Sequence, residues 1–210
     1  MRSLLSILGL VLITLSAAEV GYSVGVTTLP RFVEPAKFAI TLEPELTFGS
    51  QAGLGVNGRY TQGVSDYVNL TGVLGTGVGP RQFRVGFGPT FDFFPDVDRQ
   101  PGIGINVQAF YSRIDPGIVD GASDQYGRFE ALATPYIHKA FHLKSGREID
   151  PFFAVPFGVG AGGRPAQGLA SAVIGILFKP VSRVRVSAEI GVPIVGMDAY
   201  FSTSIAYFHE

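Results

Sequence analysis

The chain has 210 residues and a formal net charge of −1, so it has no basic surplus that would favour a nucleic acid or another polyanionic partner. It has no cysteine, which excludes disulfides, thiolate nucleophiles and cysteine-based zinc sites. Charged residues make up only 16%, below the roughly 25% of an ordinary soluble domain, and glycine is frequent, with 28 residues.

The first 18 residues have the pattern of a secretory signal peptide. Arg2 gives a positive start, residues 4–15 are mostly apolar, and residues 16–18 are small. The apolar run is shorter than the ~20 residues that a spanning helix needs, so a membrane anchor is the weaker alternative. We therefore expect residues 1–18 to be a signal peptide that is cleaved before Glu19.

The remainder of the chain alternates between apolar and polar residues with a period of two. In residues 37–48 and again in 183–194, the apolar side chains fall mainly on even positions, and the odd positions are polar or small. Alternation this long indicates strands with one apolar face and one polar or glycine-rich face. The pattern predicts ten strands, at residues 37–49, 53–63, 66–78, 81–94, 102–113, 127–142, 149–161, 167–178, 183–194 and 198–208.

The connections between these strands are short and rich in turn residues, apart from one long loop at residues 115–127. Prolines at five strand positions each remove a ladder hydrogen bond, so we expect them to mark bulges or strand ends. They are Pro44, Pro89, Pro135, Pro156 and Pro193.

The polar faces indicate which side of the sheet is inside. A soluble barrel points its apolar face inward, whereas a membrane barrel points it outward and keeps the polar face in the lumen. Here the polar faces carry charges in mid-strand together with many glycines, and basic residues roughly balance acidic ones, with Arg183 among the inward bases. We therefore predict that the lumen is lined by Lys37, Glu43, Glu45, Arg59, Arg84, Asp92, Arg128, Glu130, Arg185 and Glu189.

Aromatic residues supply a second indication. An even number of strands puts both chain ends at one rim, and the aromatics then divide between that rim and the opposite one, which also holds the long loop. At the rim near the chain ends we expect an aromatic girdle of Phe38, Tyr60, Tyr67, Phe91, Phe93, Phe141, Phe153, Phe178 and Tyr207. At the opposite rim we expect Phe48, Phe83, Tyr111, Phe129 and Phe201.

The last strand, "AYFSTSIAYFHE", is similar to the assembly signal of outer-membrane barrels, with alternating apolar residues and a terminal aromatic, although His209 and Glu210 follow that aromatic. Over residues 37–208 the chain resembles the outer-membrane β-barrel proteins of Gram-negative bacteria, of the porin-like or small-barrel type. The resemblance implies export through the inner membrane, an outer-membrane location, contact with outer-membrane lipid and insertion by the barrel-assembly machinery.

These observations predict one all-β domain, an up-and-down antiparallel transmembrane β-barrel over residues 36–210. Residues 19–35 are expected to form a periplasmic or lumen-entering lead. If they contribute strands instead, a twelve-stranded barrel is the alternative, because an odd count would break the even number of bacterial barrels.

Candidate catalytic and metal-binding residues are few. Asp96 and Asp98 lack the spacing of a calcium loop, since Pro101 stands where an EF-hand has glycine, and a polar turn is the simpler interpretation. His138 and His142 lie four residues apart on one strand, about 13 Å, too far to chelate one metal. We expect His138 to make a structural hydrogen bond in the lumen, with Glu130 or Tyr136 as partner.

The sequence therefore predicts no catalytic residue, no metal and no cofactor. The expected function is structural, or that of a narrow, poorly selective pore for small solutes, because ten strands lie near the filled end of the barrel range. Two alternatives stay open: a barrel enzyme that acts on lipid or peptide, and a secreted lipocalin-like barrel that binds an apolar ligand.

Overall fold

The computed structural model describes residues 33–49, 52–79, 81–115, 118–119, 122–123, 125–144, 146–162 and 165–209. The expected signal peptide and most of the expected lead, residues 19–32, lie outside the described residues. No helix in the described part of the chain is long and apolar enough to cross a membrane.

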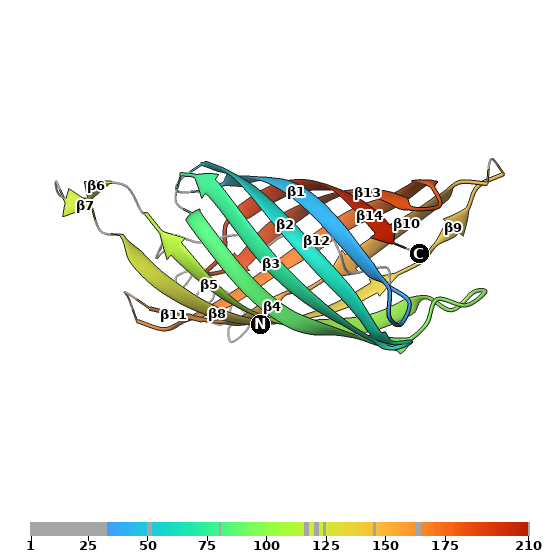
Figure 1. The fold of residues 1–210 in the computed structure, drawn as a ribbon. Helices are drawn as coiled ribbons and strands as arrows, with labels where there is room; N and C mark the ends of the chain where they lie inside the picture. The colour runs from blue at the N-terminus through green and yellow to red at the C-terminus, as the bar shows by residue number, and fades with distance from the viewer. Residues whose placement is uncertain are drawn as a thin grey trace, which may run out of the picture.

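The described residues form a closed antiparallel barrel (Figure 1). Its ring closes because β1 pairs with both β2 and β14. In ring order, the wall consists of β1 (Phe38–Phe48), β2 (Gly53–Ser65), β3 (Val68–Val78), β4 (Arg81–Phe94), β5 (Gly102–Ile114), β8 (Tyr126–His138), β10 (Glu148–Ala154) continued by β11 (Phe157–Ala161), β12 (Gln167–Val181), β13 (Val184–Val195) and β14 (Ala199–His209).

Three short strands lie outside this ring. The pair β6 (Ile118–Val119) and β7 (Ala122–Ser123) forms a hairpin within the long loop, and β9 (Phe141–His142) pairs with the start of β10. Figure 1 shows β9 and the β6–β7 hairpin projecting beyond the wall at opposite ends. We call the end where β1 begins and β14 finishes the inner end, and the end with the long loop the outer end.

The predicted barrel of ten strands is confirmed for the described residues: each predicted strand has its counterpart, and the ring does not hold twelve. Two predicted strands are shorter or interrupted. The strand predicted at 127–142 divides into β8 and β9. The strand predicted at 149–161 breaks at Pro156, where Pro156 O accepts a hydrogen bond from Ser171 N at 3.0 Å and Val155 N still donates to Pro135 O at 3.0 Å.

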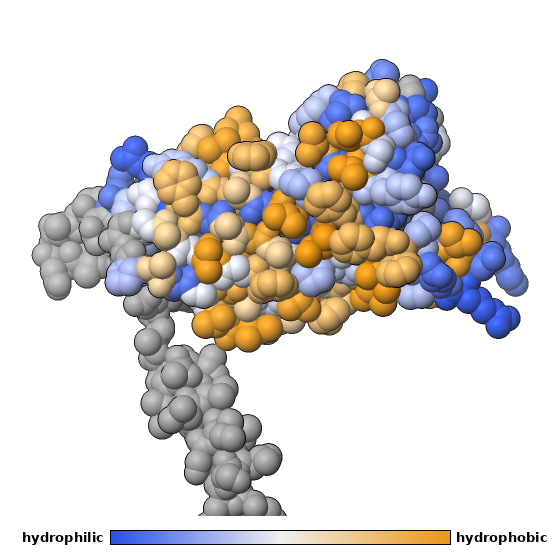
Figure 2. All heavy atoms as spheres, turned by 90° about the horizontal axis from the view of Figure 1, so that it is seen from below, coloured by the Kyte–Doolittle hydropathy of each residue, from blue (hydrophilic) through white to orange (hydrophobic). Residues whose placement is uncertain are grey.

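The burial pattern is the reverse of that of a soluble protein. Glu43 is 0% exposed and Arg84 1%, whereas Phe87 is 71% exposed and Ile174 63%. Along each strand the buried and exposed positions alternate, as the pleat requires, but the buried set is the polar one. Figure 2 shows apolar side chains over the middle of one outer face, with hydrophilic groups gathered toward the ends.

Glycines on the inward faces make room for large inward rings on the neighbouring strand. Gly175 faces Phe152, and a Cβ on Gly175 would lie 2.2 Å from Phe152 Cζ. Gly191 faces Tyr200, and a Cβ there would lie 1.9 Å from Tyr200 Cε1. The glycine-rich inward faces of the sequence therefore serve the packing of the interior.

Candidate functional site

The interior holds a charged wall, which we define as the ion-paired residues Glu43, Glu45, Arg59, Arg81, Arg84, Arg128 and Glu130. Its most enclosed pair joins β1 and β2. Arg59 donates from Nε to Glu43 Oε2 at 2.5 Å and from Nη2 to Glu43 Oε1 at 3.3 Å, and both side chains are almost fully buried. Asn57 Nδ2 adds a long contact of 3.5 Å to the same carboxylate. Such a two-pronged guanidinium–carboxylate contact fixes the position of both groups.

Arg81 belongs to this wall, although strict period-two alternation would put it on the same face as Phe83. A register shift between Arg81 and Phe83 against β5 marks a β-bulge at Gln82. The bulge turns both Arg81 and Arg84 inward, and Arg81 Nη2 lies 2.8 Å from Glu45 Oε1. Sequence periodicity missed Arg81 because a bulge changes the parity of the strand.

Next to these pairs, β4 and β8 share a three-residue ion cluster. Arg84 Nη2 lies 3.6 Å from Glu130 Oε2, and Arg128 Nε lies 3.2 Å from Glu130 Oε1. Arg84 also donates from Nε to Ser112 Oγ at 3.4 Å and covers the ring of Phe110, whose centroid is 4.9 Å from Cζ. The cation therefore has a carboxylate, a hydroxyl and an aromatic face around it.

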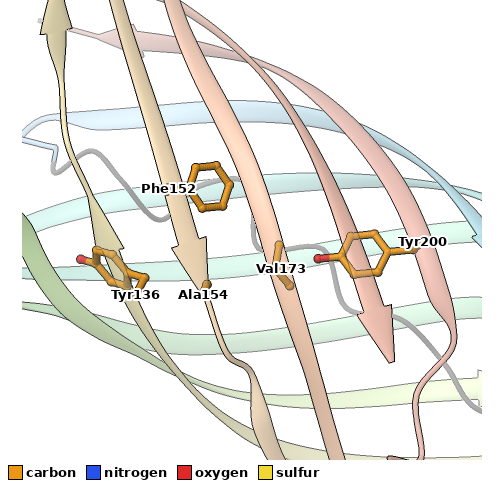
Figure 3. Close-up of a cluster of buried hydrophobic side chains, with 5 residues drawn as sticks. All are labelled: Tyr136, Phe152, Ala154, Val173 and Tyr200. Atoms are coloured by element: carbon orange, nitrogen blue, oxygen red, sulfur yellow. The ribbon is translucent and has the colours of Figure 1, made fainter. Parts of the chain in front are cut away.

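The opposite part of the interior is an aromatic wall, defined as Tyr136, Phe152, Ala154, Val173 and Tyr200 (Figure 3). These residues come from β8, β10, β12 and β14. Tyr200 links the aromatic wall to a buried charge outside the charged wall, because its hydroxyl donates to Glu189 Oε1 at 2.9 Å while its ring is fully buried.

A second buried apolar cluster lies nearer the outer end. It consists of Val73, Phe110, Leu132, Leu169 and Met197. These residues extend from β3 through β5 and β8 to β12 and the β13–β14 turn, so the cluster covers much of the interior circumference. Apolar side chains at such a level oppose the passage of water and ions.

At the inner end, the predicted hydrogen bond of His138 is present, but its partner is different. His138 Nδ1 lies 3.0 Å from Asp150 Oδ1 and 3.1 Å from Asp150 Oδ2, and neither Glu130 nor Tyr136 is its partner. The expectation failed because β8 and β10 are paired so that His138 faces Phe152, which leaves Asp150 as its diagonal neighbour. That register could have been found by counting back from the turn between the two strands.

The remaining predicted lumen residues lie near the inner mouth. Asp92 is half-buried and faces inward from β4. Lys37 is half-exposed just before β1 and pairs with Glu34 at 2.6 Å, so it lies at the mouth and not within the lumen. Arg185 is buried, yet its Nη1 donates to three carbonyls of residues 181–184 instead of reaching across the lumen. Arg183, expected inward, is exposed because it stands in the turn before β13.

The two aspartates of the loop at residues 95–101 play a structural part. Asp96 accepts hydrogen bonds from Lys139 Nζ and, at 2.6 Å, from Ala140 N. Lys139 Nζ also donates to Asp98 O at 2.6 Å and to Gln100 O at 3.2 Å. Burial raises the pKa of Asp96, but its hydrogen bonds from Lys139 and Ala140 outweigh that effect and leave the pKa below its usual range. The loop is therefore fastened to the connection between β8 and β9, and no three His, Asp or Glu residues of the described chain converge as metal ligands.

None of the nine aromatics expected at the inner rim is buried, and each is at least partly exposed on the outer surface. Phe38 stacks on Tyr60 with ring centroids 5.6 Å apart and on His209 at 4.6 Å. Phe153 lies deeper in the wall than the others, well past the start of β10. At the outer end, Tyr111 and Phe129 face each other with centroids 4.9 Å apart.

A wall that buries arginine and glutamate pairs while exposing rows of isoleucine, valine and phenylalanine needs an apolar solvent around it. Among the described residues, each strand of the closed ring also has a neighbour on both sides, and hydrocarbon would not tolerate an open sheet edge. The chain folds as a transmembrane β-barrel. Its apolar outer surface faces lipid, and its polar residues fill the interior of the barrel.

No protein-family model matches this transmembrane barrel, and no curated protein matches its sequence. Among solved structures, it is similar to a chain from the de novo design of transmembrane β-barrels, over 85% of this chain and 100% of that one, with a TM-score of 0.37 and 12% identity. It is also similar to the NanC porin, over 81% of this chain and 100% of the porin, with a TM-score of 0.40 and 10% identity. The assignment rests on the burial pattern and the closed ring.

Proposed function

We propose that the protein is an outer-membrane β-barrel with a structural role, whose interior is closed to solutes at rest. The observation that carries the proposal is the burial of the charged wall: Glu43, Arg59, Arg84 and Glu130 are 0–3% exposed although they lie in the interior of a barrel. Side chains that line an open aqueous channel keep contact with water. These side chains instead contact one another in ion pairs. The second buried apolar cluster, which includes Val73 and Met197, adds a further obstruction.

A narrow pore is the second candidate, and one observation favours it. Several buried polar atoms have no hydrogen-bond partner among the described residues, namely Asn57 Oδ1, Ser171 Oγ and Tyr136 Oη. Buried polar atoms without a protein partner are usually satisfied by water. A file of water molecules past these atoms would give a low-conductance path, with the lumen charges setting its selectivity.

Planar-bilayer recording separates the two candidates. A closed barrel gives no conductance steps for the purified, heat-modifiable protein. Arg84→Ala is then expected to give steps, because it removes one of the large, almost fully buried side chains of the charged wall. A narrow pore gives small steps for the unmodified protein, and Glu189→Ala changes their ion selectivity. Steps of constant size in the unmodified protein would contradict the closed barrel.

The family resemblance and the lipid-facing surface support the proposed outer-membrane location. Density-gradient fractionation of expressing cells is expected to recover the protein with outer-membrane markers, and recovery in the soluble fraction would contradict the proposal. We further propose that the protein is not an enzyme. Turnover of lipid or peptide that His138→Ala abolishes would overturn that part.

A further inference from the structure

The hairpin that joins β8 to β10 projects past the barrel wall at the inner end (Figure 1). Its strands are held in register because β9 pairs with the start of β10, with Phe141 opposite Ile149. Its turn is tight: Leu143 N donates to Arg147 O at 2.8 Å, and Gly146 N donates to Leu143 O at 3.0 Å. Gly146 has a φ of 75°, which favours glycine there.

The outward face of this hairpin continues the lipid-facing surface of the barrel. Phe141 lies opposite Ile149, and Ile149 lies opposite Phe178 of β12, so the three side chains share one face. Leu143 is two residues beyond Phe141 and keeps that face, with Arg147 opposite it. Phe141 and Leu143 are both exposed, at 54% and 40%. The apolar surface therefore reaches up the hairpin and ends at a cation.

The height of this part of the wall places that cation at the membrane surface. From Glu148 to Ala161, β10 and β11 extend about 46 Å along the strand at ~3.3 Å per residue. At the usual tilt of ~40°, this is about 35 Å along the barrel axis, compared with ~30 Å of hydrocarbon. Leu143, Lys144 and Arg147 lie beyond the start of β10, at the depth of lipid headgroups.

The turn and the adjacent loop carry three exposed cations that differ from Lys37 and Lys139 in having no carboxylate partner among the described residues. Lys37 and Lys139 are neutralised by Glu34 and Asp96. Exposed Lys144, Arg147 and Arg99 have no ion pair with any of the residues that the structure describes.

The hydrogen bond from Ala140 N to Asp96 holds the loop of Arg99 beside the hairpin. Asp98, exposed on the same loop, offsets Arg99, so the net excess belongs to Lys144 and Arg147. A lysine and an arginine next to exposed Phe141 and Leu143 match a phospholipid, with the two apolar side chains against the acyl chains and the cations on the phosphate.

We propose that the hairpin tip formed by Leu143, Lys144 and Arg147 is a binding surface for anionic phospholipid headgroups at the inner leaflet. The proposal rests on the membrane location of the barrel, and it is independent of whether the interior conducts. Each basic residue near a negative membrane surface strengthens attraction about fivefold, so two of them give a measurable preference.

The test uses the full folded chain reconstituted in bilayers of phosphatidylcholine with a minor share of phosphatidylglycerol. After mild detergent extraction, native mass spectrometry counts the retained lipids of each kind. The unmodified protein is expected to retain phosphatidylglycerol about tenfold or more above its bulk share, and Lys144→Ala with Arg147→Ala is expected to reduce this to near the bulk ratio.

Three controls make the outcome decisive. Lys144→Arg with Arg147→Lys keeps the charge and is expected to keep the preference. Arg113→Ala, which removes an exposed cation at the outer end, is expected to leave it unchanged. Heat-modifiable mobility shows that each variant is folded.

Retention of the two lipids at their bulk ratio by the unmodified protein would overturn the proposal, and so would a preference that the double alanine variant keeps. Complete displacement of the lipid by inorganic phosphate would also overturn it, because that result describes an anion site without a part for the acyl chains. Conductance recordings on the same samples test the closed interior separately.

Discussion

The charged wall and the aromatic wall fill the same barrel by different means. In the charged wall, Arg59 and Glu43 form a buried ion pair, and each would lose its closest opposite charge without the other. In the aromatic wall, Phe152 is accommodated because Gly175 opposite it has no side chain. The charged wall therefore depends on ion pairing, and the aromatic wall depends on the steric fit between a large ring and a glycine.

This difference implies different responses to substitution. Loss of one member of a buried ion pair leaves a charge that hydrocarbon and protein both solvate poorly. A methyl group added to a glycine that faces the aromatic wall displaces a ring but leaves no unpaired charge. Tyr200 belongs to both kinds of contact, since its ring occupies the place above Gly191 and its hydroxyl binds Glu189.

The largest effect is expected from Arg59→Ala in the charged wall. It leaves Glu43 buried without its guanidinium, and we expect the free energy of unfolding to fall by about 3–5 kcal/mol. Urea unfolding in lipid vesicles, followed by heat-modifiable mobility, measures the change. The double variant Glu43→Gln with Arg59→Met is expected to recover most of the loss, because it removes both charges together. A double variant as unstable as the single one would show that packing, and not charge pairing, stabilises this wall.

A smaller loss is expected in the aromatic wall. Gly175→Ala places a Cβ 2.2 Å from the Phe152 ring, and displacement of the ring is expected to cost about 1–3 kcal/mol. Gly72→Ala is the matched control, because a Cβ at Gly72 meets nothing within 4 Å. We expect the control to change the free energy of unfolding by less than about 0.5 kcal/mol. Equal losses from both variants, measured in the same vesicle assay, would mean that the ring and the glycine are not matched in shape.

The two walls also differ in what the sequence could predict. Period-two alternation places Glu43, Arg59 and Arg84 on the interior face without knowledge of which strands are neighbours, because the face of a residue is a local property. Their partners are not local. The bulge that turns Arg81 inward and the register that places Asp150 beside His138 depend on the pairing between strands, which alternation within one strand does not contain.

The same distinction applies to the prolines. Pro156 stands at the break between β10 and β11, and Pro193 lies opposite Ser171, where the register of β12 and β13 shifts. Pro44, Pro89 and Pro135 lie inside β1, β4 and β8 with no register shift beside them, so the expected bulge or strand end is wrong for these three. A missing N–H therefore allows an irregularity without requiring one. The form that it takes depends on the neighbouring strand.

At the outer end, one buried carboxylate packs against a glycine, as the rings of the aromatic wall do. Asp198 is 7% exposed and packs against Gly49, and its Oδ2 has no hydrogen-bond partner among the described residues. Burial raises the pKa of Asp198 to about 6. The folded state therefore binds this proton at a higher pH than the unfolded chain, whose aspartate pKa is about 3.9. The stability that protonated Asp198 contributes is fully present below about pH 4 and is lost as the pH rises through 6.

Asp198→Asn is expected to remove this dependence. The variant should be more stable than the unmodified protein at pH 8, and the difference should shrink as the pH is lowered to 5, because the unmodified side chain then becomes neutral as well. Urea midpoints of the two proteins at the two pH values measure it. A difference that stays constant with pH would mean that Asp198 is solvated or paired in the folded barrel.

At the inner end, another carboxylate is held by charge pairing, as in the charged wall. Its substitution is expected to have the smallest effect. Asp96 is paired with Lys139 and accepts the Ala140 N–H, which lowers its pKa despite partial burial. Its contribution is therefore present above the usual aspartate pKa and is lost as the pH falls through the lowered value in the folded state. Asp96→Asn is expected to weaken the fastening of the loop by about 0.5–1 kcal/mol at neutral pH, which corresponds to a two- to fivefold faster hydrogen exchange at Ala140 N. Asp98→Asn is the matched control, since Asp98 offers Lys139 its backbone oxygen, which the substitution keeps. Unchanged exchange in Asp96→Asn would show that the loop is held by the hydrogen bonds from Lys139 Nζ to the backbone oxygens of Asp98 and Gln100, and that the Asp96 charge adds nothing to it.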